Sequence, residues 1–236
     1  MSIWELILLF ISGIAGLIVY IFPVDPGHHS KNIKYLLTFS GSYLLGVCFF
    51  DIFPEIYSPS FSSTNAFFLA AGFFIQVLLE NISGGLDHGH LHHHAGIREK
   101  MAFAALILHS VLEAGSLLFE NSKQILAGII IHNLPLSFFI TIYLRTGSKK
   151  LYNVVVPLVI FSLSAPLAYL VYQQWSIEGS VYEDYTKNIA ALSVGIIFHI
   201  STVILFESNK DHKIDFTKLG LLFLGLSVSF MANFLI

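Results

Sequence analysis

Three ionisable side chains lie within long apolar segments of the sequence, where each is costly to bury. His109 and Glu113 are four residues apart, so in a helix they share one face about one turn from each other. His132 lies in the next apolar segment. Two imidazoles and a carboxylate suit a borderline cation such as Zn²⁺. This pattern predicts a divalent-metal site.

Polar neighbours extend both segments. Ser110 and Asn133 directly follow the two histidines and are further candidate ligands. Pro135 has no N–H, so the carbonyl of Ile131 loses its helical partner and must face protein or water. The alternative interpretation is that both histidines are neutral and hydrogen-bonded within a helix bundle. The combined pattern of the two segments favours metal binding over this alternative.

The composition is that of an integral membrane protein. Hydrophobic residues make up 55% of the 236 residues and charged residues 11%, whereas a soluble domain carries about 25% charged residues. The mean hydropathy is +0.75. Apolar runs predict one all-α membrane domain over residues 1–236 with eight transmembrane helices. We place them at about 3–22, 35–53, 65–83, 101–119, 124–144, 151–173, 187–206 and 216–236.

Charge and cysteine content exclude other classes of protein. The net charge of −3 is small and gives no reason to expect nucleic acid as a partner. The single cysteine, Cys48, lies inside an apolar run. It excludes a disulfide framework and a Cys-based zinc ribbon. We expect Cys48 to be a small buried hydrophobic residue.

Basic residues sort the links between the helices into two sides. With an extracytoplasmic N-terminus, ten Lys and Arg residues fall in the inner links and two in the outer links. This asymmetry follows the positive-inside rule and predicts that both termini are extracytoplasmic. We expect the plasma or inner membrane, with an organelle membrane as the alternative. The inner residues are Lys31, Lys34, Arg98, Lys100, Arg145, Lys149, Lys150, Lys210, Lys213 and Lys218, and the outer ones are Lys123 and Lys187.

Acidic side chains favour the outer side. Asp51 and Glu55 share a face at the outer end of the second span, while Ser116 and Glu120 continue the face of Glu113 outward. Carboxylates attract cations, so we expect these residues to form the outer access route. For Asp51 and Glu55 the alternative is that they are ordinary solvated carboxylates at a helix end.

A histidine-rich link follows the third span, at about residues 84–99 on the predicted cytoplasmic side. Its composition predicts a flexible metal-binding tract. Glu80, at the inner end of the third span, either joins this tract in an exit route or only reaches the membrane interface. His199 in the seventh span is interpreted as structural. The histidines of the tract are His88, His90, His92, His93 and His94.

In their order and spacing these features resemble the ZIP family of metal-ion transporters, along nearly the whole chain. The resemblance implies inverted repeats of helices one to three and six to eight around a central fourth and fifth helix. It also implies metal movement toward the cytosol, often within a homodimer. The matching segments are Ser40-Gly41 through Gly46-Val47 to Asp51-Ile52-Phe53-Pro54-Glu55, Gly72 to Glu80, the histidine-rich link, His109-Ser110 to Glu113, His132-Asn133-Leu134-Pro135 and Ser164-Ala165-Pro166-Leu167.

Within the sequence itself, Gly46-Val47-Cys48-Phe49 and Gly195-Ile196-Ile197-Phe198 echo one another in the second and seventh helices. The fifth helix departs from the family pattern His-Glu-x-Pro-His-Glu. Asn133 replaces the first carboxylate, while Leu136 and Ser137 replace the second histidine and the last glutamate. We therefore expect one metal ion at His109, Glu113 and His132, completed by water or Asn133, in place of a two-metal centre.

The predicted function is transport of a divalent transition metal into the cytosol. Zinc is the first candidate, with Fe²⁺ or Mn²⁺ as alternatives, and we expect no organic cofactor and no enzyme activity. One rival is a metal sensor or buffer of the same fold that does not transport. A second rival, an intramembrane zinc hydrolase, is disfavoured because we expect no acid besides Glu113 deep in the membrane.

Overall fold

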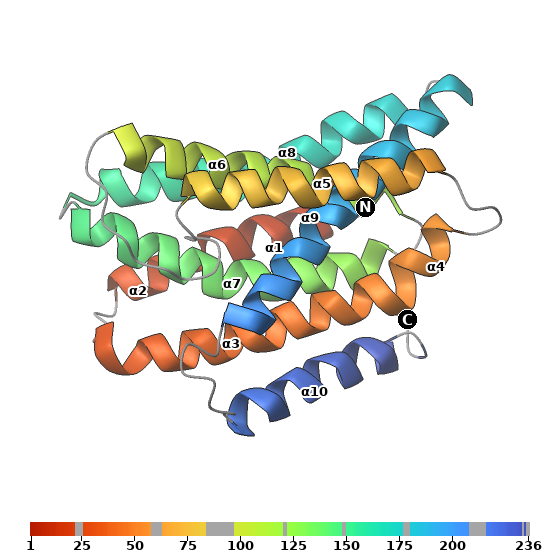
Figure 1. Cartoon of the computed structure of the whole chain (residues 1–236). Helices are drawn as coiled ribbons and strands as arrows, with labels where there is room; N and C mark the ends of the chain where they lie inside the picture. The colour runs from red at the N-terminus through yellow and green to blue at the C-terminus, as the bar shows by residue number, and fades with distance from the viewer. Residues whose placement is uncertain are drawn as a thin grey trace.

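The computed structural model of this chain is helical in all the parts that it describes, with no strand among them. It describes residues 1–21, 26–57, 63–83, 97–119, 122–147, 150–176, 180–207, 216–232 and 234. The helices, shown in Figure 1, are α1 (Ile3–Ile14), α2 (Leu17–Ile21), α3 (Pro26–Val47), α4 (Phe53–Ile56), α5 (Ser63–Ser83), α6 (Ile97–Glu113), α7 (Ser122–Gly147), α8 (Tyr152–Ser176), α9 (Ser180–Glu207) and α10 (Phe216–Ala232). Two shorter segments continue α3 and α6: the π-helical turn η1 (Cys48–Ile52) and the 3₁₀ helix η3 (Ala114–Leu118).

Six helical segments of the described chain are long and apolar enough to cross a membrane. They are Ile33–Ile52, Ser63–Ser83, Lys100–Leu118, Ser122–Arg145, Tyr152–Gln174 and Tyr185–Ile204. These segments confirm an all-helical membrane architecture. The expected count of eight transmembrane helices is not confirmed. The apolar helices Ile3–Ile14 and Phe216–Ala232 have fewer than the 18 residues taken as the minimum for a membrane span.

The first predicted span, at 3–22, is not one helix. It is broken between α1 and α2 at Ala15 and Gly16. A Cβ atom on Gly16 would lie 2.1 Å from the carbonyl oxygen of Ser137, so a glycine is required for this approach to α7. The break therefore brings the chain against the middle of α7, near its internal Pro135.

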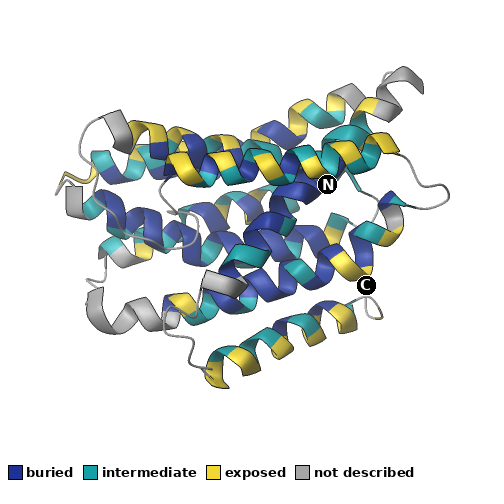
Figure 2. Ribbon diagram, viewed as in Figure 1, coloured by how far each residue is buried: buried dark blue, intermediate teal, exposed yellow. Residues whose placement is uncertain are grey.

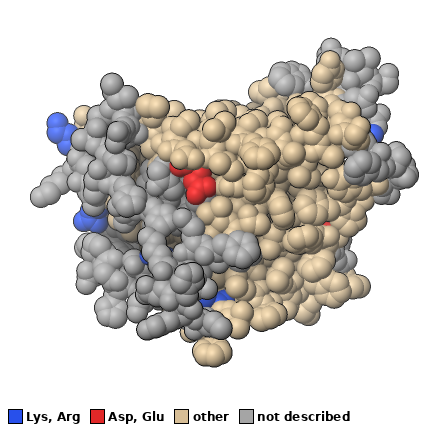
Figure 3. Space-filling view, viewed as in Figure 1, with Lys and Arg blue, Asp and Glu red and all other residues tan. Residues whose placement is uncertain are grey.

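The helices form a layered bundle in which α5, α6 and α8 cover one side and α3 and α10 the other (Figure 1). α1 and α7 lie between these layers, and α9 crosses the bundle diagonally. Burial follows this arrangement, because α7 and the middle of α9 are mostly buried whereas α10 alternates between exposed and partly buried residues (Figure 2). Most of the described surface in Figure 3 carries no charged side chain, as expected for a surface that faces lipid.

Helices α5 and α9 cross so closely that only glycine fits at two points. A Cβ atom on Gly72 would lie 1.9 Å from the carbonyl oxygen of Leu192. A Cβ atom on Gly195 would lie 2.0 Å from the carbonyl oxygen of Leu69. Small residues that let two backbones touch are a common basis of helix packing in membranes. The crossing fixes α5, which carries Gln76 and Glu80, against α9.

A second glycine crossing joins α3 to α10, where Gly46 meets Ser229 and Gly225 meets the carbonyl oxygen of Phe39. Gly46 and Gly195 occupy the matching positions of the two sequence segments that echo one another, and α3 and α9 run in opposite directions (Figure 1). The rings that end these segments, Phe49 and Phe198, touch edge to face with centroids 6.0 Å apart.

Candidate metal site

The last turn of α6 carries a buried histidine–carboxylate pair. His109 and Glu113 are 2% and 1% exposed, and His109 Nε2 lies 3.7 Å from Glu113 Oε2. This juxtaposition follows from their spacing, because residues four apart lie on one face of a helix. The other carboxylate oxygen, Glu113 Oε1, is buried and has no hydrogen-bond partner among the described residues. A buried acceptor in this state is costly and points to a missing donor or cation.

A third buried polar residue joins this pair from a different helix. Gln76 of α5 is 0% exposed, and its Oε1 lies 3.1 Å from His109 Nδ1. Gln76 is not among the ligands predicted from the sequence. The sequence feature that could have identified Gln76 is a polar amide within an apolar run. It lies one helical turn after Gly72 and one turn before Glu80, so all three residues share one face of α5.

The chain beyond Glu113 tightens into the 3₁₀ helix η3. In a 3₁₀ helix residues three apart lie directly in line, so Ser116 falls on the same side as Glu113. Its buried hydroxyl donates a 2.7 Å hydrogen bond to the carbonyl oxygen of Glu113. Ser116 therefore lies close to the candidate site, as the sequence predicts, but its hydroxyl binds backbone. Glu120 lies outside the described residues.

The remaining predicted ligands, on α6 and α7, are also buried. Ser110 is 2% exposed, and His132 and Asn133 on α7 are 0% and 4% exposed. However, α6 packs mainly against α5, α8 and α9, and its continuation η3 makes the closer contact with α7. The close packing of this segment against α7 is therefore limited mainly to η3. A short link limits the distance between two helix ends, but it leaves their other ends free to diverge.

No group of three or more His, Cys, Asp or Glu side chains in the described part of the chain is close enough to hold a metal ion. The structure brings His109 to Glu113 and to Gln76, but it does not assemble His132 with that pair into such a group. A three-ligand site at His109, Glu113 and His132 therefore stays a prediction.

Leu136 and Ser137, which depart from the family pattern, serve the packing of α7. Leu136 is fully buried in an apolar cluster that includes Leu106, Ile140 and Phe161. The Ser137 hydroxyl donates a 2.8 Å hydrogen bond to the carbonyl oxygen of Leu134, one turn earlier in the helix.

Asp51 is not the solvated carboxylate at a helix end that one interpretation expected. It is 4% exposed and lies in the π-helical turn η1. A π turn holds more residues than an α turn and so shifts the face on which later side chains lie. Among the described residues, Asp51 is thus a second buried carboxylate beside Glu113. The side chain of Glu55 lies outside the described residues.

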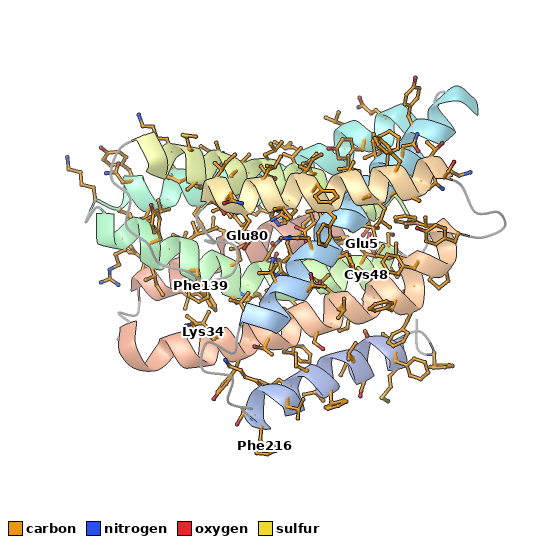
Figure 4. All side chains as sticks on the ribbon, in the orientation of Figure 1. Glu5, Lys34, Cys48, Glu80, Phe139 and Phe216 are labelled. Atoms are coloured by element: carbon orange, nitrogen blue, oxygen red, sulfur yellow. The ribbon has the colours of Figure 1, made fainter. Side chains whose placement is uncertain are left out.

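A second histidine–carboxylate pair joins α5 to α9. Glu80 Oε2 lies 3.5 Å from His199 Nε2, and the Phe73 ring meets the His199 ring edge to face at 4.8 Å. Glu80 is labelled near the centre of the view in Figure 4, and 24% of its side chain is exposed. These contacts support the structural interpretation of His199. The histidine tract expected beyond Glu80 lies outside the described residues.

No protein-family model matches the chain. The chain is similar to a curated relative, zinc transporter ZIP1 of Danio rerio, with 24% identity over 191 residues. The match covers 59% of this chain and 63% of the relative, so the chain spans less than two thirds of the relative's length.

Proposed function

We propose that this protein transports divalent transition-metal ions, zinc first, into the cytosol through a site that includes His109 and Glu113. The observation that carries this proposal is the buried pair itself, with Glu113 Oε1 lacking a hydrogen-bond partner among the described residues. An uncompensated carboxylate is expensive in an apolar bundle, and a cation removes that cost. Similarity to a zinc transporter adds independent support.

The distance within the pair suits a shared metal ion. Zinc lies about 2.0–2.1 Å from a histidine nitrogen and about 2.0–2.2 Å from a carboxylate oxygen. At a tetrahedral angle these two ligands are about 3.4 Å apart. The 3.7 Å between His109 Nε2 and Glu113 Oε2 differs from that value by a few tenths of an ångström. An ion can therefore enter between the two atoms with little side-chain movement.

Two protein ligands leave a zinc ion incompletely coordinated, so others must complete the shell. Water, Ser110 and Asn133 are candidates, and His132 is the strongest because imidazole suits zinc. In this proposal His132 joins the ion when the bundle rearranges during transport. Outer carboxylates, including Asp51, would concentrate the cation, and Glu80 with the histidine tract would accept it on the inner side.

Zinc uptake into proteoliposomes tests the proposal. His109→Ala and Glu113→Gln should each reduce uptake to background, because each removes one ligand of the buried pair. His132→Ala should do the same if His132 completes the site. Ser201→Ala is the control, since it removes a buried polar group whose hydroxyl binds the carbonyl oxygen of Ile197 and which we do not place on the route of the ion, and uptake per folded protein should persist. Equal uptake by all variants would refute the site.

The second candidate function is a metal sensor or buffer that does not transport. Two observations favour it. No three-ligand group occurs among the described residues, and Leu136, which stands where the family pattern has a histidine, packs in an apolar cluster. Saturable zinc binding by the wild-type protein, without flux in the same liposomes, would identify this function.

A further inference from the structure

Gln76 contacts His109 on the side of the imidazole that faces away from Glu113. Its amide oxygen Oε1 lies 3.1 Å from Nδ1, while Nε2 is the nitrogen nearest the carboxylate. An amide oxygen can only accept a hydrogen bond, so Nδ1 must carry the hydrogen in this arrangement. A neutral imidazole has one N–H, and Nε2 therefore keeps its lone pair.

We propose that Gln76 is a positioning residue that holds His109 as the Nδ1–H tautomer and thereby presents Nε2 as a metal ligand. This inference rests on the proposed function, because it assigns Gln76 a role at the same site. Metal-binding histidines generally donate their other N–H to an oxygen acceptor, which fixes both the tautomer and the orientation of the ring. In this chain the acceptor comes from α5, a different helix from the ligands.

The Nδ1–H tautomer prepares the pair to receive a cation. With the hydrogen on Nδ1, the lone pair of Nε2 faces Glu113 Oε2, another acceptor, at 3.7 Å in a buried site. Two acceptors that face each other away from water repel, and a cation or a proton between them relieves the repulsion. The opposite tautomer would direct an N–H at Glu113 and block coordination through Nε2.

The helix that carries Gln76 is held firmly where it meets the site. Gly72, one turn before Gln76, packs against the backbone of α9, and Glu80, one turn after it, contacts His199 of α9. A supporting group on a rigid element keeps a ligand oriented better than one on a loop. The α5–α9 crossing therefore fixes the position from which Gln76 reaches His109.

The tautomer can be measured in the metal-free protein, independently of transport. In lipid nanodiscs, ¹⁵N-histidine spectra identify the protonated ring nitrogen, and the His109 signals are those lost in His109→Ala. We expect the Nδ1–H form in the wild-type protein and a shift toward the Nε2–H form in Gln76→Leu. Gln76→Glu keeps an acceptor oxygen in reach and should retain the Nδ1–H form. Gln124→Leu, the same change at another buried glutamine, should leave the signals unchanged.

Zinc affinity provides the second readout. Loss of such a supporting partner typically weakens metal binding by about 10–100-fold. We expect a change of that size for Gln76→Leu, measured by competition with a zinc-binding dye, and near wild-type affinity for Gln76→Glu and Gln124→Leu. The inference would be overturned if His109 of the wild-type protein is the Nε2–H tautomer. It would also be overturned if Gln76→Leu leaves the tautomer unchanged, even if zinc is transported. A Gln76-dependent tautomer in a wild-type protein that binds no zinc would support the positioning role and refute the proposed function.

Discussion

Glu80 of α5 and His199 of α9 form a side-chain contact of 3.5 Å across the glycine-lined crossing of these two helices. The contact has the same chemical composition as the His109–Glu113 pair but connects two helices instead of two turns of one helix. The side chains of His199 and Glu80 are 6% and 24% exposed, whereas both side chains of the His109–Glu113 pair are 2% exposed. We assign the Glu80–His199 contact to stabilising the α5–α9 crossing.

Glu80→Gln and His199→Asn should each lower the stability of the protein, and their effects should not be additive. Contacting residues of this kind couple by about 0.5–3 kcal/mol, and partial exposure of Glu80 favours the lower part of that range. Unfolding of both single variants and the double variant in mixed micelles measures the coupling. Strictly additive effects would show that the two side chains do not stabilise one another.

Alanine at Gly72 or Gly195 should destabilise the protein, because the new Cβ atom would overlap the backbone of the facing helix. Overpacking of this kind costs about 1–3 kcal/mol. The control is Gly220→Ala, since a Cβ atom at Gly220 of α10 meets nothing within 4 Å. In a helix alanine is favoured over glycine by about 1 kcal/mol, so this control should be neutral or stabilising. Similar losses at all three positions would contradict the close crossing of α5 and α9.

Leu136→Ala should reduce stability without changing zinc affinity. The side chain is fully buried in an apolar cluster, and truncation of such a residue costs about 2–5 kcal/mol. Thermal unfolding and zinc competition on the folded fraction separate the two effects. A weaker zinc affinity in folded Leu136→Ala would mean that this position contributes to the metal site.

Zinc uptake should fall as the pH falls. Protons compete with the metal for His109 Nε2, whose lone pair a proton occupies, and for the Glu113 carboxylate, whose negative charge a proton removes. The same buffer must be used inside and outside the liposomes, so that no proton gradient drives the ion. Uptake that rises with acid at equal pH on both sides would contradict direct ligation by these groups.

Local and compositional features of this protein were readable from the sequence. Long apolar runs require helices in a bilayer, because a helix satisfies its own backbone hydrogen bonds. The His109–Glu113 contact was predictable because a four-residue spacing within one helix determines which side chains are neighbours. The burial of Cys48 followed from its apolar surroundings in the same way and is confirmed.

Only the tertiary structure decided which residues meet across helices. Gln76 reaches His109, and Glu80 reaches His199, because the α5–α9 crossing sets how α5 is rotated toward its neighbours. The π-helical turn that buries Asp51 and the divergence of α6 from α7 also depend on packing against distant segments. Helix rotation and crossing angle arise from many small contacts along the whole interface, and no short sequence pattern encodes them.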